Sequence, residues 1–195
     1  MGFAADKKQQ LMLVVTTAGR PGAILDGVKV STTIVEGGPM AAVQRTAEVD
    51  WTGSIARGSG HASGGSGALG DLPITVASRF GEPEGKTSPE ELIAAAHAAC
   101  FTMALGSILA ARRTPPEHLW VTATVTLETS GTPTIASSRL EVHGVVPGAD
   151  AASFDRAAQE AERNCPVSRA LQGSVEIGVQ ATLDEHPGSS GVGAA

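Results

Sequence analysis

The chain has 195 residues, which suits one domain of ordinary size with additional tails. Apolar residues make up 42% of it and charged residues 17%, so a core can be buried, although aromatic residues reach only 3%. A formal net charge of −6, with no block of Lys or Arg, is unfavourable for binding phosphate backbones or anionic lipid. The uninterrupted apolar runs are much shorter than the ~20 residues that span a bilayer. We therefore expect a soluble protein with neither a nucleic acid nor a membrane as its partner.

The two ends of the chain are predicted to lie outside the folded domain. Residues 1–45 form an expected N-terminal extension, in which two lysines precede a short apolar run that lacks the features of a signal peptide. Residues 186–195 contain too little apolar surface to offset the entropy of ordering, and we expect a flexible tail there. The folded domain should then cover residues 46–185. A cytoplasmic location is expected, where thiols are kept reduced.

The first predicted elements are strands, followed by a long helix. Alternating residues at 47–55, and apolar segments at 68–69 and 74–77, indicate an antiparallel meander. A helix should begin at Pro89, because Ser88 can cap it, proline suits its first position, and Glu91 would complete a capping box. It should extend to about Arg112. Its residues are apolar almost all round, which predicts a central helix buried on most faces.

The second half of the chain continues with strands, two helices and a last strand. We expect strands at residues 120–128 and 135–146, a helix at 150–163, a short helix starting at 165–168, and a last strand at 174–183. Together these elements predict an α+β fold, with an antiparallel sheet packed on the long central helix.

The only two cysteines are the strongest candidates for chemistry. Cys100 lies in the apolar helix, where a buried, inert thiol is the common alternative. Cys165 precedes Pro166 at the start of a helix, whose positive end stabilises a thiolate. As a pair they could act in turn: one thiolate attacks a peroxide to give a sulfenic acid, and the second condenses with it to a disulfide.

Charged groups that could support a thiolate lie upstream of the helix and in its first turn. Arg79 could equally be a solvated residue at the end of a strand, and Glu90 could simply favour the positive end of the helix. Arg20 is a rival guanidinium. Glu90 precedes Cys100 by ten residues, or roughly 15 Å along a helix, so the two cannot touch within one helix. A catalytic Glu90 must therefore come from a second subunit or act through a distortion of the helix start, and we expect a dimer with shared active sites.

His97 lies one turn before Cys100 and could serve as a base or a metal ligand. A histidine there is more often a core residue whose hydrogen bonds are satisfied. A zinc site built from His97 and the two cysteines lacks the short-spaced cysteine pairs that mark structural zinc. The phosphate-binding P-loop motif is not present either. We expect neither a metal nor a cofactor.

Four segments carry a resemblance to a known family. The run SPEELIAAAHAACFTMAL at residues 88–105 resembles the central helix of the OsmC branch of the OsmC/Ohr family. The sequence CPVS at 165–168 resembles the second cysteine site of that family, and residues 47–69 and 78–80 also fit. The likeness covers about residues 46–183. The spacing of residues 81–86, between Arg79 and the helix, resembles an insertion.

The resemblance implies an intertwined homodimer that reduces organic hydroperoxides, and less readily hydrogen peroxide, in stress defence. The reductant would be a dithiol, commonly a lipoylated protein. By position, Cys100 would be the attacking thiol and Cys165 the resolving one, while Arg79 and Glu90 would hold the thiolate and orient the peroxide.

Two other functions remain open at this stage. A redox sensor would use the same disulfide to change a surface without turnover. A hydrolase with a cysteine nucleophile and His97 as its base would act on esters without a reductant. Peroxide turnover that depends on a dithiol, without hydrolysis of esters, would identify the peroxidase and distinguish it from the sensor and the hydrolase.

Overall fold

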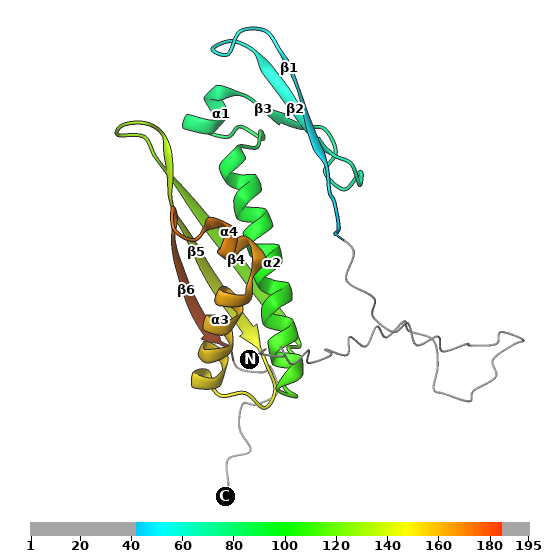
Figure 1. Cartoon of the computed structure of the whole chain (residues 1–195), viewed down its shortest axis with the longest axis vertical. Coiled ribbons are helices and arrows are strands. Elements are labelled where there is room, and N and C mark those ends of the chain that lie inside the picture. The colour runs from blue at the N-terminus through cyan, green and yellow to red at the C-terminus, as the bar shows by residue number, and fades with distance from the viewer. Residues whose placement is uncertain (1–41, 185–195) are drawn as a thin grey trace, which may run out of the picture. The chain divides into compact units, whose positions relative to one another are not determined.

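The computed structural model describes residues 42–184 (Figure 1). Most of the predicted extension, including Arg20, and the predicted tail lie outside the described residues, so their roles stay predictions. The elements are β1 (Ala47–Thr52), β2 (Ser59–Gly64), β3 (Leu72–Ile74), α1 (Val76–Phe80), α2 (Pro89–Ala111), β4 (His118–Glu128), β5 (Thr134–Val145), α3 (Ala151–Asn164), α4 (Pro166–Leu171) and β6 (Glu176–Leu183). The α+β class is as predicted.

The first sheet is an antiparallel meander, as expected, with β1 pairing to β2 and β2 to β3. Its middle strand is β2, however, and the predicted segment 68–69 lies in the turn that follows β2. The prediction that residues 74–77 form a strand is wrong beyond Ile74. Thr75 caps the short helix α1 instead, because its hydroxyl accepts from the backbone N–H of Ser78 while the Ser78 hydroxyl accepts from the backbone N–H of Thr75. This reciprocal capping box turns the chain out of the sheet immediately before Arg79.

The second sheet has the order β4–β5–β6, and it corrects the prediction of a purely antiparallel sheet. β4 and β5 pair antiparallel, whereas β5 and β6 pair parallel. A parallel neighbour needs a crossover, and α3 and α4 supply it between β5 and β6. Along β4 and most of β5 the burial alternates residue by residue, so one face of this sheet is covered and the other is exposed.

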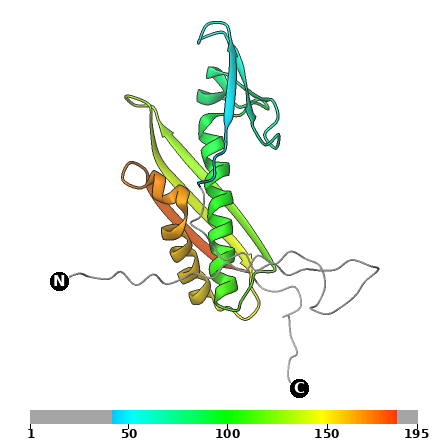
Figure 2. The same cartoon turned by 45° about the vertical axis from the view of Figure 1, so that its right-hand side comes forward.

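Two helices cover that face of the second sheet. α2 contacts β4 and α3 contacts β6, and the helices contact each other, as Figures 1 and 2 show. The core lies between them and the sheet and is built from Phe101, Leu105, Leu109, Leu140, Val142, Val146, Phe154, Ala157, Ala158, Ala161 and Cys165.

Helix α2 begins as predicted but is buried along one stripe only. Ser88 caps it and Pro89 opens it, although the Glu91 side chain accepts from the Thr87 hydroxyl at 2.7 Å rather than completing a capping box. The fully buried side chains from His97 onward recur every fourth residue, ending at Leu109. Burial on most faces, as the apolar sequence predicts, is therefore not reached within one chain. Among the described residues α2 alone is long and apolar enough to cross a membrane, a property that core helices of soluble proteins share.

Close packing across the core predicts a large effect at Gly144 on β5. A Cβ there would lie 2.6 Å from Cζ of Phe154, a fully buried ring. Gly144→Ala is therefore expected to lower the free energy of unfolding by about 1–3 kcal/mol, because the core cannot take the extra carbon without shifting. Gly131→Ala is the matched control, since nothing lies within 4 Å of its added Cβ. Urea unfolding of both variants tests this, and equal stabilities would contradict it.

Candidate active site

The structure brings the two cysteines together. Cys100 lies on α2, and the Cys165 side chain and the backbone N–H of Val167 are near enough to shift the pKa of its thiol, although no disulfide joins the two cysteines. Both cysteines are free thiols, with Cys100 half-buried and Cys165 completely buried. Residues separated by 65 positions in the chain thus form one dithiol site, with the more accessible sulfur on the central helix.

Cys165 owes its position to the break between α3 and α4. It ends α3 and caps α4, and Pro166 occupies the first helical position, where its missing N–H costs no hydrogen bond. The Cys165 sulfur accepts the backbone N–H of Ser168 at 3.5 Å. Successive N–H groups in the first turn of α4 therefore serve the two sulfurs, that of Val167 serving Cys100 and that of Ser168 serving Cys165.

The surroundings of Cys100 within one chain oppose its ionisation. Burial raises the pKa of the Cys100 thiol, the hydrogen bond with the Cys165 side chain raises it further, and the N–H of Val167 lowers it. The net shift is upward from the ordinary value of 9.0. Because the thiolate is the nucleophile, an additional positive group beside Cys100 would be needed to activate it at neutral pH.

The predicted positive group, Arg79, is paired with Glu90. Its Nε lies 3.0 and 3.3 Å from the two carboxylate oxygens and one terminal nitrogen lies 2.7 Å from Oε1. Glu90 is buried, and the Arg79 guanidinium also lies over the Phe80 ring, 5.5 Å from its centroid. The loop between α1 and α2 folds back through the Ser78 hydroxyl, which donates to the Thr87 carbonyl at 3.2 Å. The unusual spacing of residues 81–86 therefore still allows Arg79 to reach the start of α2.

The four predicted site residues thus form two pairs. Arg79 and Glu90 lie at the N-terminal end of α2, and the two cysteines lie near its middle. Cys100 follows Glu90 by ten positions on α2, which corresponds to roughly 15 Å along the helix. A single chain therefore contains both halves of the predicted site but does not join them.

His97 is a core residue with both ring nitrogens hydrogen-bonded. Nδ1 lies 2.7 Å from the Ser138 hydroxyl on β5, and Nε2 lies 2.8 Å from the Ser168 hydroxyl on α4. All three side chains are buried. Sequence reasoning did not find Ser138 or Ser168, because nothing in the chain shows that residues 41 and 71 positions away meet His97. In residues 42–184 no cluster of three His, Cys, Asp or Glu side chains could hold a metal ion.

The buried state of His97 predicts how stability depends on pH. Burial lowers the pKa of His97 from the ordinary value of 6.5, so the unfolded chain binds this proton more readily than the folded one. Stability should be fully present above pH 6.5 and fall as the pH drops through 6.5 towards the folded pKa. His97→Gln should flatten this slope of the unfolding free energy, measured by urea unfolding between about pH 7 and 5. His61→Gln, at an exposed position on β2, should leave the slope unchanged; loss of the slope there too would contradict the assignment.

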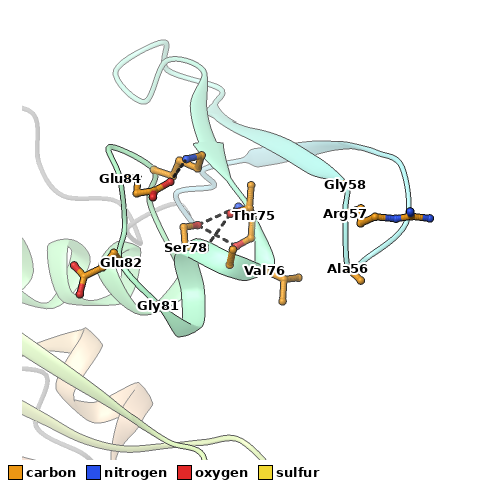
Figure 3. Close-up of a pocket in the computed structure, with 11 residues that line it drawn as sticks. Ala56, Arg57, Gly58, Thr75, Val76, Ser78, Gly81, Glu82 and Glu84 are labelled. Atoms are coloured by element: carbon orange, nitrogen blue, oxygen red, sulfur yellow. Dashed lines mark hydrogen bonds and ion pairs between the residues drawn. The ribbon is translucent and has the colours of Figure 1, made fainter.

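A cavity of about 430 Å³ lies elsewhere, beside α1 (Figure 3). Figure 3 shows Thr75 and Ser78 at its wall with their mutual hydrogen bonds, and the carboxylates of Glu82 and Glu84 nearby. Neither cysteine lines it, nor do Arg79 and Glu90. It is therefore separate from the dithiol site.

Comparison with known proteins agrees with this fold. A family model described as OsmC-like protein matches residues 81–180. Peroxiredoxin OsmC of Escherichia coli is 39% identical over 139 residues, which cover 71% of this chain and 96% of that protein. The same sequence match is found for peroxiredoxin OsmC of Shigella flexneri.

Solved structures of OsmC-like and hydroperoxide resistance proteins have a similar fold. The organic hydroperoxide resistance protein OhrB of Bacillus subtilis is 27% identical, with a TM-score of 0.56, over 70% of this chain and 98% of that one. An OsmC-like protein from Mycoplasma pneumoniae, at 16% identity and a TM-score of 0.59, covers 73% of this chain and 99% of its own, and shows the shared fold. The chain belongs to the OsmC-like family, as the resemblance in its central helix predicts.

Proposed function

We propose that this protein is a thiol peroxidase that reduces organic hydroperoxides, and less readily hydrogen peroxide, with Cys100 and Cys165. The observation that carries the proposal is that the only two cysteines of the chain are neighbours in the fold, one on the central helix and one at a helix start. The names of the relatives, a peroxiredoxin and a hydroperoxide resistance protein, point to the same chemistry.

In the first step, the Cys100 thiolate attacks the outer oxygen of the hydroperoxide. An S–O bond forms, the O–O bond breaks, and the alkoxide leaves and takes a proton to become the alcohol. Cys100 is suited to this role because its side chain is half-buried, whereas Cys165 is fully buried. Cys100 packs against the apolar core, and apolar surroundings favour an alkyl or aryl peroxide over hydrogen peroxide.

In the second step, the Cys165 sulfur attacks the sulfenic sulfur of Cys100. The disulfide forms, the S–O bond breaks, and hydroxide leaves and is protonated to water. A dithiol, such as the dihydrolipoyl group of a protein, then returns both cysteines to thiols and is itself oxidised to a disulfide. This cycle needs neither a metal nor a cofactor, and a cytoplasmic location would keep the resting cysteines reduced.

A homodimer would join the two halves of the site. We infer that Arg79 and Glu90 of one copy lie against Cys100 of the other, which would supply the positive charge that Cys100 lacks within its own chain. The exposed apolar face of α2 supports this assembly: Met103 is 67% exposed, although apolar helices of this kind are normally covered. Covering that face with a second α2 would bury the central helix on most faces.

The dimer can be tested at Met103. Met103→Glu places a charge in the proposed interface, and burying an unpaired charge is costly, so the variant should be largely monomeric and lose most hydroperoxide turnover. Light scattering after size exclusion measures the mass, and a peroxide assay measures turnover. Thr124→Glu, at an exposed position on the uncovered face of β4, is the matched control and should remain dimeric. A monomeric wild type, or a fully dimeric Met103→Glu, would contradict the assembly.

The function itself is tested by following cumene hydroperoxide with dihydrolipoamide as reductant. Rapid turnover that is far slower with a monothiol is the expected result. Oxidation of one equivalent without turnover would instead indicate a redox sensor. Hydrolysis of esters without any reductant would indicate a cysteine hydrolase.

A further inference from the structure

A buried polar cluster lies beside the dithiol site, where the surrounding core is apolar. His97 on α2, Ser138 on β5 and Ser168 on α4 are at most 1% exposed. Unpaired polar groups are costly inside a core, and here each side chain has a partner through the two short hydrogen bonds of the His97 ring. The hydrogen bonds of this cluster therefore connect α2, β5 and α4.

The two hydrogen bonds of the His97 ring form two arms of this cluster, the Ser168 arm and the Ser138 arm. Only the Ser168 arm leads to a cysteine. Ser168 is the third helical residue of α4, and while its hydroxyl bonds Nε2 of His97, its backbone N–H donates to the Cys165 sulfur at 3.5 Å. Ser138, bonded to Nδ1, lies on β5, and within residues 42–184 its hydroxyl forms no hydrogen bond with either sulfur. His97 is thus connected to Cys165 through a single residue.

The attacking cysteine belongs to the same helix. Cys100 follows His97 by three residues on α2, so the helix that carries Cys100 also holds, through Ser168, the turn that carries Cys165. Residues three apart lie on one side of a helix. A rigid link of this kind keeps the two sulfurs in register, and disulfide closure requires them to approach to about 2 Å with a restricted dihedral geometry.

We propose that His97 is a positioning residue for Cys165, acting through Ser168 to hold the first turn of α4 so that Cys165 can close the disulfide with Cys100. The inference rests on the proposed two-cysteine function and deepens it. His97 neither donates nor accepts a proton in the closure step, in which the Cys165 thiolate attacks the sulfenic sulfur of Cys100, the S–O bond breaks, and the leaving hydroxide takes a proton from solvent to become water. Its contribution is to the geometry of that step and not to the attack on peroxide.

The two arms provide a matched experiment. Ser168→Ala and Ser138→Ala each remove one buried hydroxyl from the same ring. His97→Asn keeps an amide near Nδ1 and loses the Ser168 arm, whereas His97→Gln keeps an amide near Nε2 and loses the Ser138 arm. Reduced protein is mixed rapidly with one equivalent of cumene hydroperoxide, and the sulfenic acid and disulfide are followed by dimedone trapping and mass spectrometry.

We expect Ser168→Ala and His97→Asn to slow closure about tenfold more than they slow Cys100 oxidation, the effect of one lost buried hydrogen bond. Ser138→Ala and His97→Gln should close within about twofold of the wild type, because their link to α4 is intact. Equal slowing in both arms, or slowing in neither, would show that the cluster is only structural. If the His97 variants fail to fold, the comparison of closure rates between Ser168→Ala and Ser138→Ala tests the proposal.

A second oxidant separates this inference from the proposed function. Diamide oxidises two thiols to a disulfide and is itself reduced to a hydrazine, so it reports closure without any peroxide. If wild-type protein fails to react with hydroperoxide, the peroxidase function is wrong. The same ranking of the four variants with diamide would nevertheless support His97 as a positioning residue. Equal closure rates for the four variants would overturn that inference.

Discussion

Cys100→Ser is expected to abolish hydroperoxide turnover, with a loss of at least about a thousandfold, because an alcohol at this position cannot form the nucleophilic anion near neutral pH. The measurement is consumption of cumene hydroperoxide with dihydrolipoamide at several protein concentrations. Since Cys100 is only partly buried and the oxygen is smaller than sulfur, the fold should persist. Unfolding in urea would check that the loss is chemical.

Cys165→Ser is the matched control for that loss. Without the resolving thiol, the Cys100 sulfenic acid should still form with one equivalent of peroxide and then accumulate, as dimedone trapping would show. Turnover should fall but not vanish, because an external dithiol can reduce the sulfenic acid directly. The reverse pattern, in which Cys165→Ser is inactive and Cys100→Ser retains turnover, would exchange the roles of the two cysteines.

Arg79→Ala is expected to reduce hydroperoxide turnover by about 10²–10³-fold, a typical cost of losing a preorganised charged donor. The physical reason is that burial holds the pKa of Cys100 above its ordinary value, so the thiolate needs a cation beside it. The pH midpoint of Cys100 oxidation should therefore move upward in this variant. Arg79→Lys should recover only part of the loss, because an ammonium lacks the planar fork that binds Glu90 through two nitrogens.

Mixing two inactive variants tests whether Arg79 acts across the dimer. In a mixed dimer of Cys100→Ser and Arg79→Ala, one site would combine an intact Cys100 with the intact Arg79 of the other copy. Random exchange of equal amounts should then restore about a quarter of wild-type activity, since half of the dimers are mixed and half of their sites are whole. No recovery after verified subunit exchange would place Arg79 and Cys100 in the same chain.

Much of the fold was predictable from local patterns. The Ser88–Pro89 start of α2 and the Asn164–Cys165–Pro166 break before α4 are set by capping and by the missing N–H of proline, which act within a few residues. Alternation along β4 likewise identified a strand with one buried face. These are local effects, so the chain displays them directly.

Other elements were not predictable from such patterns. β2 has the sequence SGHASG, with no strand-like apolar residues, and Gly60 is required there because a Cβ would lie 2.8 Å from the Trp51 ring on the neighbouring strand. The parallel pairing of β5 and β6 depends on where α3 and α4 return the chain. The β2 strand and the parallel pairing of β5 with β6 both depend on neighbours that are distant in sequence. Local propensity therefore cannot predict them.

The candidate site divides in the same way. The sequence by itself determined the family, the two cysteines, and the conclusion that Glu90 cannot reach Cys100 along one helix, because motif identity and helical rise depend on the chain alone. Only the tertiary structure decided that Cys100 meets Cys165, that Arg79 pairs with Glu90, and that His97 connects Ser138 and Ser168. These contacts join residues on different elements, and their geometry is set by packing of the helices against the sheet rather than by any local preference.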